Sequence, residues 1–209
     1  MSWRTATTSA LLTTDAAFEM FVHTDGSPVI IFPKPREVLH FVFSIASEVG
    51  EVDTLDWQVL GGNRIIKDGI LPQVAESTSA LGIAIADQQG NDDYYMGMYF
   101  NMTSGGEIGD LRVIADYDDA GGAAAALVTL EAALTGTPSA AETYSIYHLS
   151  EIVDGSGSIT SETALTEALP QNAEFGASGY PCLIPRVKAG GGTDAHIALL
   201  TYTRDGVDA

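Results

Sequence analysis

Residues 37–45, EVLHFVFSI, and residues 195–203, AHIALLTYT, are short apolar runs that contain Val, Ile, Phe or Tyr. Clusters of Gly, Asp, Ser and Pro separate them from further runs of the same kind. This spacing is typical of β-strands joined by turns. Lys and Arg, which favour helices, number only nine in 209 residues, whereas Gly numbers 22. The sequence therefore predicts an all-β fold.

Eleven runs are expected to form strands, which for a chain of this length is typical of a β-sandwich or barrel. They cover residues 18–23, 28–32, 37–45, 55–60, 81–86, 94–102, 111–117, 126–131, 143–149, 182–188 and 195–203. One short helix is expected over residues 159–169, ITSETALTEAL, because Ser and Thr precede acidic residues and Pro170 follows.

The charge of the chain restricts its partners. Its 28 Asp and Glu against nine Lys and Arg give a formal net charge of −19, while apolar residues make up 45% and charged residues 18%. A buried core is therefore expected, and disorder is not. Because so acidic a protein repels phosphate backbones and anionic lipid headgroups, we expect neither nucleic acid nor a membrane as a partner. The N-terminal residues show no signal-peptide pattern, which predicts a soluble protein.

Motifs for catalysis or cofactor binding are absent from the sequence. Cys182 is the single cysteine, which excludes an intrachain disulfide and a cysteine-based metal site. The four histidines have no metal-binding spacing, and the strings GSGS at 155–158 and GASGY at 176–180 lack the context of a nucleophile elbow. Local acidic clusters, such as Asp92 with Asp93, are expected to be solvated turns. We therefore predict no enzyme, no cofactor and no metal.

Residues 93–149 contain a motif of aromatic, glycine and turn residues. The stretch DYYMGMYFNMTSGGEIGDLRVIADYDDA is followed by ALVTLEAALTGTPSAAETYSIYHL. The motif consists of a Tyr-Tyr-x-Gly start, a Thr-Ser-Gly-Gly turn, a Gly-Asp-x-Arg-x-Ile segment and a closing Thr-x-Pro to Tyr segment. It is carried by Tyr94, Tyr95, Gly97, Ser104, Gly105, Gly109, Arg112, Ile114, Tyr117, Pro138 and Tyr144. In these positions the segment resembles small β modules found in structural proteins of tailed bacteriophages.

The residues of this module also have a physical interpretation. Gly97 within a strand pattern indicates a bulge or a close backbone approach, whereas Gly105 and Gly109 supply the positive φ of tight connections. Arg112 lies among apolar residues and is expected to pair with Asp110 or Asp116. These positions are therefore predicted to be structural.

The segments that flank the module resemble two halves of one phage-type β-sandwich. The resemblance implies a discontinuous sandwich of residues 1–92 and 150–209, with residues 93–149 inserted as a small β-barrel-like module. Loop tips accept such insertions because their ends are close together and solvated. Residues near 20–60 and 180–205 should therefore share one core.

The resemblance implies a non-enzymatic protein of the phage virion. A capsid decoration protein is the leading interpretation, and a tail or neck appendage that binds a receptor or glycan is the alternative. A β-sandwich glycoside hydrolase is a third possibility. Trp57 alternates with Leu55 and Val59, which predicts core packing for Trp57 rather than stacking on a sugar.

The N-terminal residues 1–17 are the predicted contact segment. They carry Trp3, Leu11 and Leu12 with almost no charge, unlike the acidic remainder. Such a segment is unfavourable in water and too short to form its own core. We expect it to pack against other copies of the chain, with a trimer favoured, and against another virion protein.

Overall fold

A computed structural model of the chain describes residues 3–8, 18–34, 37–49, 54–119, 126–160, 171–176, 180–189 and 195–205. Its described part contains twelve β-strands, one turn of 3-10 helix and no α-helix. Neighbouring strands pair in antiparallel fashion. The predicted all-β fold is confirmed.

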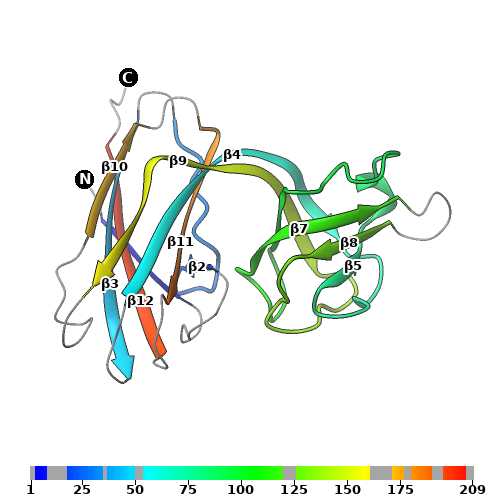
Figure 1. Cartoon of the computed structure of the whole chain (residues 1–209), viewed down its shortest axis with the longest axis horizontal. Helices are drawn as coiled ribbons and strands as arrows, with labels where there is room; N and C mark the ends of the chain where they lie inside the picture. Colours follow the sequence, from blue (N-terminus) through cyan, green and yellow to red (C-terminus); the bar gives the residue numbers. More distant parts are fainter. Residues whose placement is uncertain are drawn as a thin grey trace. The chain divides into compact units, whose positions relative to one another are not determined.

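The elements occur in the following order (Figure 1): β1 Arg4–Thr8, β2 Glu19–Val22, β3 Val38–Val49, β4 Thr54–Ile70, β5 Ala80–Gly82, the 3-10 turn η1 Ile85–Asp87, β6 Tyr99–Met102, β7 Leu111–Asp118, β8 Leu127–Leu130, β9 Thr143–Thr160, β10 Gln171–Gly176, β11 Cys182–Ala189 and β12 Ala195–Asp205.

The chain divides into two compact units, of which the second is inserted into the first. Unit 1 comprises Met1–Gly62 and Ser150–Ala209, and unit 2 comprises Asn63–Leu149. The second unit therefore begins at Asn63 and not at residue 93, where the sequence placed it. The reason is that Leu71, Leu81 and Ile83 pack in the same core cluster as residues of the predicted module.

Unit 1 is a sandwich made from one folded ladder of strands. The strand order is β10-β3-β12-β1-β2-β11-β4-β9. The rings of Phe43 on β3 and Trp57 on β4 stack 4.6 Å apart, although these strands are not neighbours in the ladder. The ladder must therefore fold over so that its two ends face each other. It does so at β2, which pairs with β1 on one side and with β11 on the other.

The core of unit 1 comes from segments far apart in the sequence. Phe41 pairs in register with Tyr202, and Phe43 pairs with Leu200. All four side chains belong to one buried cluster. Residues near 20–60 and 180–205 thus share a core, as predicted.

Unit 2 is a smaller antiparallel sheet in the order β9-β6-β7-β8-β5, with the first part of β9 at its edge. Its core is rich in aromatic residues, including the fully buried Tyr95, Phe100, Tyr117 and Tyr144. The β7–β8 ladder has a register shift between Ile114 and Asp116.

Several predicted elements differ from the structure. Residues 28–32 form only isolated bridges, residues 94–98 form turns, and residues 85–87 form η1 instead of strand. Strands β1 and β10 were not predicted. Residues 159–160 of the expected helix end β9, and residues 161–170 lie outside the described residues.

The stacked pair at the centre of unit 1 yields a stability prediction. Replacing Phe43 by Ala removes the ring that packs on Trp57 and leaves a cavity, so we expect a loss of about 3–5 kcal/mol of unfolding free energy. Val42 is its neighbour on the opposite face, and Val42→Ala should cost about 1 kcal/mol or less. Urea denaturation measures both, and equal losses for the two variants would contradict the folded-ladder core.

Candidate functional site

One outer face of unit 1 carries almost no charge. Because residues paired in register share a face, three rows of side chains cross β3, β12 and β1 opposite the core. This surface, which we call the threonine face, consists of His40, Val42, Ser44, Leu199, Thr201, Thr5 and Thr7. Thr203 lies in the same rows but is buried. In these rows the only titratable side chain is His40. Acidic residues lie at its margins: Glu174 on β10 is 3.2 Å from His40, and Asp205 ends β12.

Trp3 extends the threonine face at one end. It directly precedes β1 and is 51% exposed. The alternation of β1, continued one residue back from Thr5 and Thr7, puts Trp3 on the same face. The structure thus places the predicted contact residue Trp3 at a surface. Leu11 and Leu12, the other two predicted contact residues, lie outside the described residues.

The opposite outer face of the sandwich is charged. Arg186 on β11 donates through Nε to Oε1 of Gln58 on β4 at 2.8 Å, and Nε2 of Gln58 donates to Glu151 on β9 at 2.8 Å. The hydroxyl of Ser156 donates to the other Glu151 oxygen at 2.5 Å. These bonds lower the pKa of Glu151, with Ser156 the largest cause. A polar row thus crosses three strands.

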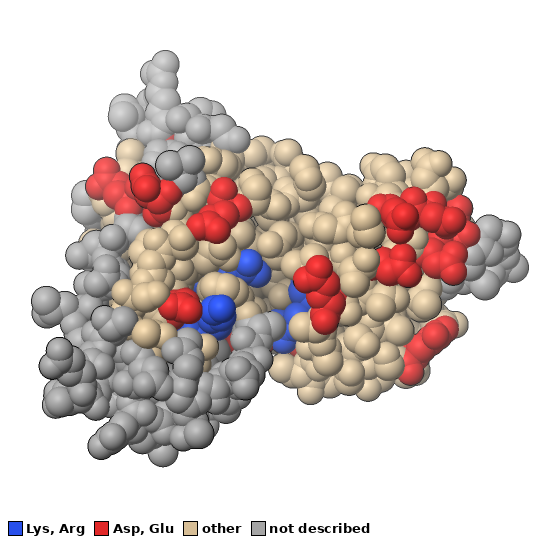
Figure 2. Space-filling view, in the orientation of Figure 1, with Lys and Arg blue, Asp and Glu red and all other residues tan. Residues whose placement is uncertain are grey.

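A second polar row runs beside the first. Lys188 lies 4.0 Å from Asp56, which also accepts a hydrogen bond from Ser158. The guanidinium of Arg186 and the ammonium of Lys188 both lie over the ring of Phe18, at 4.5 and 5.0 Å from its centroid. This face satisfies its own charges and is typical of a solvated surface, unlike the threonine face. Figure 2 shows how Asp and Glu outnumber Lys and Arg on the side of the molecule that it draws.

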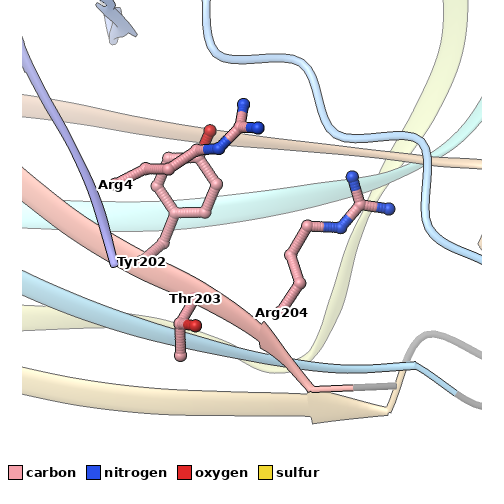
Figure 3. A pocket seen from close by; sticks show the side chains of 4 residues that line it. All are labelled: Arg4, Tyr202, Thr203 and Arg204. Atoms are coloured by element: carbon pink, nitrogen blue, oxygen red, sulfur yellow. The ribbon is translucent and has the colours of Figure 1, made fainter. Parts of the chain in front are cut away.

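A small hollow lies where β1 begins and β12 ends. It is lined by Arg4, Tyr202, Thr203 and Arg204 and encloses about 80 Å³. Figure 3 shows the side chains of Arg4, Tyr202 and Arg204 on one side of the strands and Thr203 on the other. Arg4 and Arg204 therefore continue the core-facing rows beyond the last core residue, Tyr202. They stand at the end of the sandwich.

Glu37 holds Arg204 in place. Nε and Nη2 of Arg204 donate to Oε1 and Oε2 of Glu37 at 2.8 and 2.7 Å, and Nη2 also donates to the Phe32 carbonyl at 3.0 Å. Glu37 further accepts the backbone N–H of Lys34 at 2.8 Å. The hydrogen bonds from Arg204 hold the pKa of the buried Glu37 below its ordinary value.

In unit 2, three of the four tyrosines of the predicted motif contact one loop. The hydroxyl of Tyr95 donates to the Asp87 carbonyl at 2.5 Å, and that of Tyr144 donates to the Asp87 carboxylate at 2.6 Å. Tyr117 donates to the Gln89 carbonyl at 3.0 Å and accepts the Gln89 N–H at 2.9 Å. Burial raises the pKa of Tyr95 to about 12 and raises that of Tyr144 and Tyr117. These tyrosines therefore anchor residues 87–89.

The remaining motif residues also have structural contacts. Gly105 and Gly109 have positive φ, of 90° and 92°, as predicted. Gly97 also has a positive φ, of 77°, but it lies in the turns before β6 and not within a strand. The carbonyl of buried Pro138 accepts the Ala75 N–H at 3.0 Å.

Arg112 pairs with Asp110, one of its two predicted partners. Its Nη2 lies 3.3 Å from Asp110 Oδ1, and both side chains are buried. Asp110 Oδ2 accepts the Thr135 N–H at 2.6 Å and hydroxyl at 3.0 Å, and Arg112 Nε donates to the Ala133 carbonyl at 3.0 Å. The pair fastens the segment before Thr135 to the start of β7.

The described residues contain no group of three or more His, Cys, Asp and Glu side chains placed to hold a metal ion. Nor does this part of the chain include a helix with the length and hydropathy that a membrane crossing requires. No known family model matches the sequence, and no curated protein is significantly similar to it.

Two features of the surface were not found from the sequence. The threonine face depends on which residues of β1 and β12 point away from the core, and β1 was not predicted at all. The hollow joins Arg4 to Arg204 across 200 positions of the chain. The alternation in Arg4–Thr8 was the one signal that could have located both.

The pairing of Glu37 with Arg204 yields a prediction about pH. A folded-state pKa below the ordinary 4.5 means that this carboxylate stabilises the fold above that pH, and that the stabilisation is lost as the pH falls through the lowered value. Glu37→Gln should therefore cost about 1–3 kcal/mol at pH 7 and much less near pH 3.

Urea denaturation at the two pH values measures this difference. Glu76→Gln, at an exposed position, is the matched control and should change stability little at either pH. A Glu37→Gln cost that is the same at both pH values would show that its charge contributes nothing.

Proposed function

We propose that this chain is a non-enzymatic structural protein of a tailed-phage particle that acts through contacts with copies of itself and with another virion protein. Within that class we favour a capsid decoration protein. The observation that carries the proposal is the threonine face, an uncharged sheet surface next to the exposed Trp3 on a chain of net charge −19.

Charge explains why this face suits contact between copies. Two protomers of charge −19 repel each other, and salt screens that repulsion over about 8 Å at physiological ionic strength. The approach is least unfavourable where neither surface carries charge. Protein interfaces are depleted of charged residues at their centre and enriched in aromatic residues such as Trp. The threonine face with Trp3 has this composition.

The likeness of residues 93–149 to phage modules supports the particle rather than another assembly. A decoration protein is favoured because the chain is small and its sequence has no coiled-coil or collagen-like shaft. The alternative, a tail or neck appendage that stacks aromatic residues on glycans, loses one candidate because Trp57 is buried in the core of unit 1. We favour a trimer by analogy with decoration proteins on local threefold axes.

The location is tested by labelling particles. Phage particles whose genome carries this coding sequence are incubated with gold-conjugated antibody to the purified chain and imaged by electron microscopy. Regular labelling over the capsid is the expected result. Label confined to the tail would replace decoration by the appendage function, and particles without label would contradict a virion role.

Self-association is tested by adding one charge to the threonine face. Thr5 is exposed on β1, so Thr5→Glu should fold normally but place a carboxylate at the proposed contact. We expect wild type to sediment as an oligomer, increasingly so at higher salt, and Thr5→Glu to dissociate at least about tenfold more readily. Trp3→Ala should act in the same direction.

Gln73→Glu is the control for this experiment. It adds the same charge at an exposed position in unit 2 and should leave sedimentation unchanged. A wild-type monomer at all concentrations and salts would argue against the oligomer. Because residues 4–8 form β1 within the unit 1 ladder, the N-terminal anchor is tested by Trp3→Ala, and full retention of that variant on particles would contradict it.

A further inference from the structure

The hollow between the start of β1 and the end of β12 brings together two of the nine basic residues of an acidic chain. Arg4 and Arg204 reach it from β1 and β12, and Tyr202 forms its floor (Figure 3). Arg204 is paired with Glu37, and Arg4 forms no hydrogen bond or ion pair with a residue that the structure describes. Among the residues that the structure describes, the two arginines and Glu37 sum to one net positive charge there.

The donors of Arg204 are already oriented. Its Nε and Nη2 are engaged by Glu37 and the Phe32 carbonyl, which fixes the guanidinium plane. These bonds do not use the two N–H groups of Nη1. A guanidinium held by one carboxylate loses little further side-chain entropy when it binds a second acceptor. Arg204 is therefore preorganised, and Arg4 supplies the unpaired charge.

The size of the hollow limits its ligand. At about 80 Å³ it is well below the roughly 300–1,000 Å³ of pockets that enclose small molecules. It can take one functional group and not a whole metabolite. Arginine forks match planar oxyanions, and the carboxylate of an Asp or Glu side chain has the required size and shape.

We propose that the Arg4–Arg204 hollow binds a carboxylate side chain from an acidic peptide segment of a partner protein. Trp3 precedes Arg4 and belongs to the other side of the sheet, so the occupied hollow would lie at the end of the sandwich (Figure 3) and add a charged contact beyond the edge of the uncharged threonine face. This deepens the proposed function and rests on it only for the source of the segment. The binding chemistry itself belongs to unit 1 alone.

The test uses the purified full chain and a blocked peptide of alternating Gly and Glu. Trp57 is buried and Trp3, the residue before Arg4, is half exposed, so a change in the emission of the exposed tryptophan reports binding at this end of unit 1. We expect saturable binding of the Glu peptide, weakened by salt because Arg4 is exposed. The Gln counterpart of the peptide should not bind.

Variants locate the site. Arg4→Gln should weaken binding of the Glu peptide by about tenfold or more, and Arg4→Lys, which keeps the charge without the fork, should fall between. Lys67→Gln removes the same charge from an exposed position in unit 2 and should bind as wild type does. Unchanged circular dichroism and melting temperature of Arg4→Gln would show that the variant is folded.

Three results would overturn the proposal: equal binding of the Gln and Glu peptides, equal weakening by Arg4→Gln and Lys67→Gln, or saturation by inorganic phosphate without binding of the Glu peptide. The titration needs no virion. If the chain binds the Glu peptide but is absent from particles, only the proposed function is refuted. If particles are labelled but the peptide titration shows no binding, only the proposed carboxylate site is refuted.

Discussion

The stacking of Phe43 on Trp57 packs together, in one buried core, two halves of a strand ladder whose backbones are joined at β2. Once these rings face each other, the alternation of every strand in unit 1 is determined, because a slip of one residue would move a whole row to the other face. The core rows hold Phe41, Phe43 and Leu200. The rows between them must then face outward, and this requirement creates the threonine face and the charged face.

The two outer faces manage charge in different ways. On the charged face, Arg186 and Lys188 interact with Gln58, Asp56 and the ring of Phe18, so each cation has a partner on a neighbouring strand. Among the described residues of the threonine face, only His40 has an acidic neighbour, which is Glu174 on the edge strand β10. Exposed ion pairs add little stability, so the charged face is best understood as a soluble exterior. The uncharged face lacks the strong repulsion that keeps acidic copies apart.

The sequence predicts an element well where burial of that element requires apolar residues. Residues 37–45 and 195–203 were found because a strand with one face in the core needs apolar residues. Strand β1, RTATT, was missed because it buries only Ala6 and Thr8 among its described side chains, and a row of threonines has no apolar signal. The start of unit 2 was predicted too late in the chain because the polar cluster at 87–93 resembles a linker. In the structure, Tyr95, Tyr117 and Tyr144 hydrogen-bond to Asp87 and Gln89 of this cluster and hold it against the core of unit 2.

The same reasoning explains why the candidate surfaces escaped a search for motifs. A catalytic or metal site needs particular residue types at particular spacings, and such spacings can be recognised in one dimension. A contact surface defined by missing charge has no required residue, and a hollow formed by Arg4 and Arg204 has no fixed spacing. Both become visible only when pairing in register, Arg4 with Tyr202 and Thr5 with Thr201, brings the two ends of the chain together. In a β-sandwich of this kind, function carried by surfaces is encoded in strand register, which the order of residues determines but does not display.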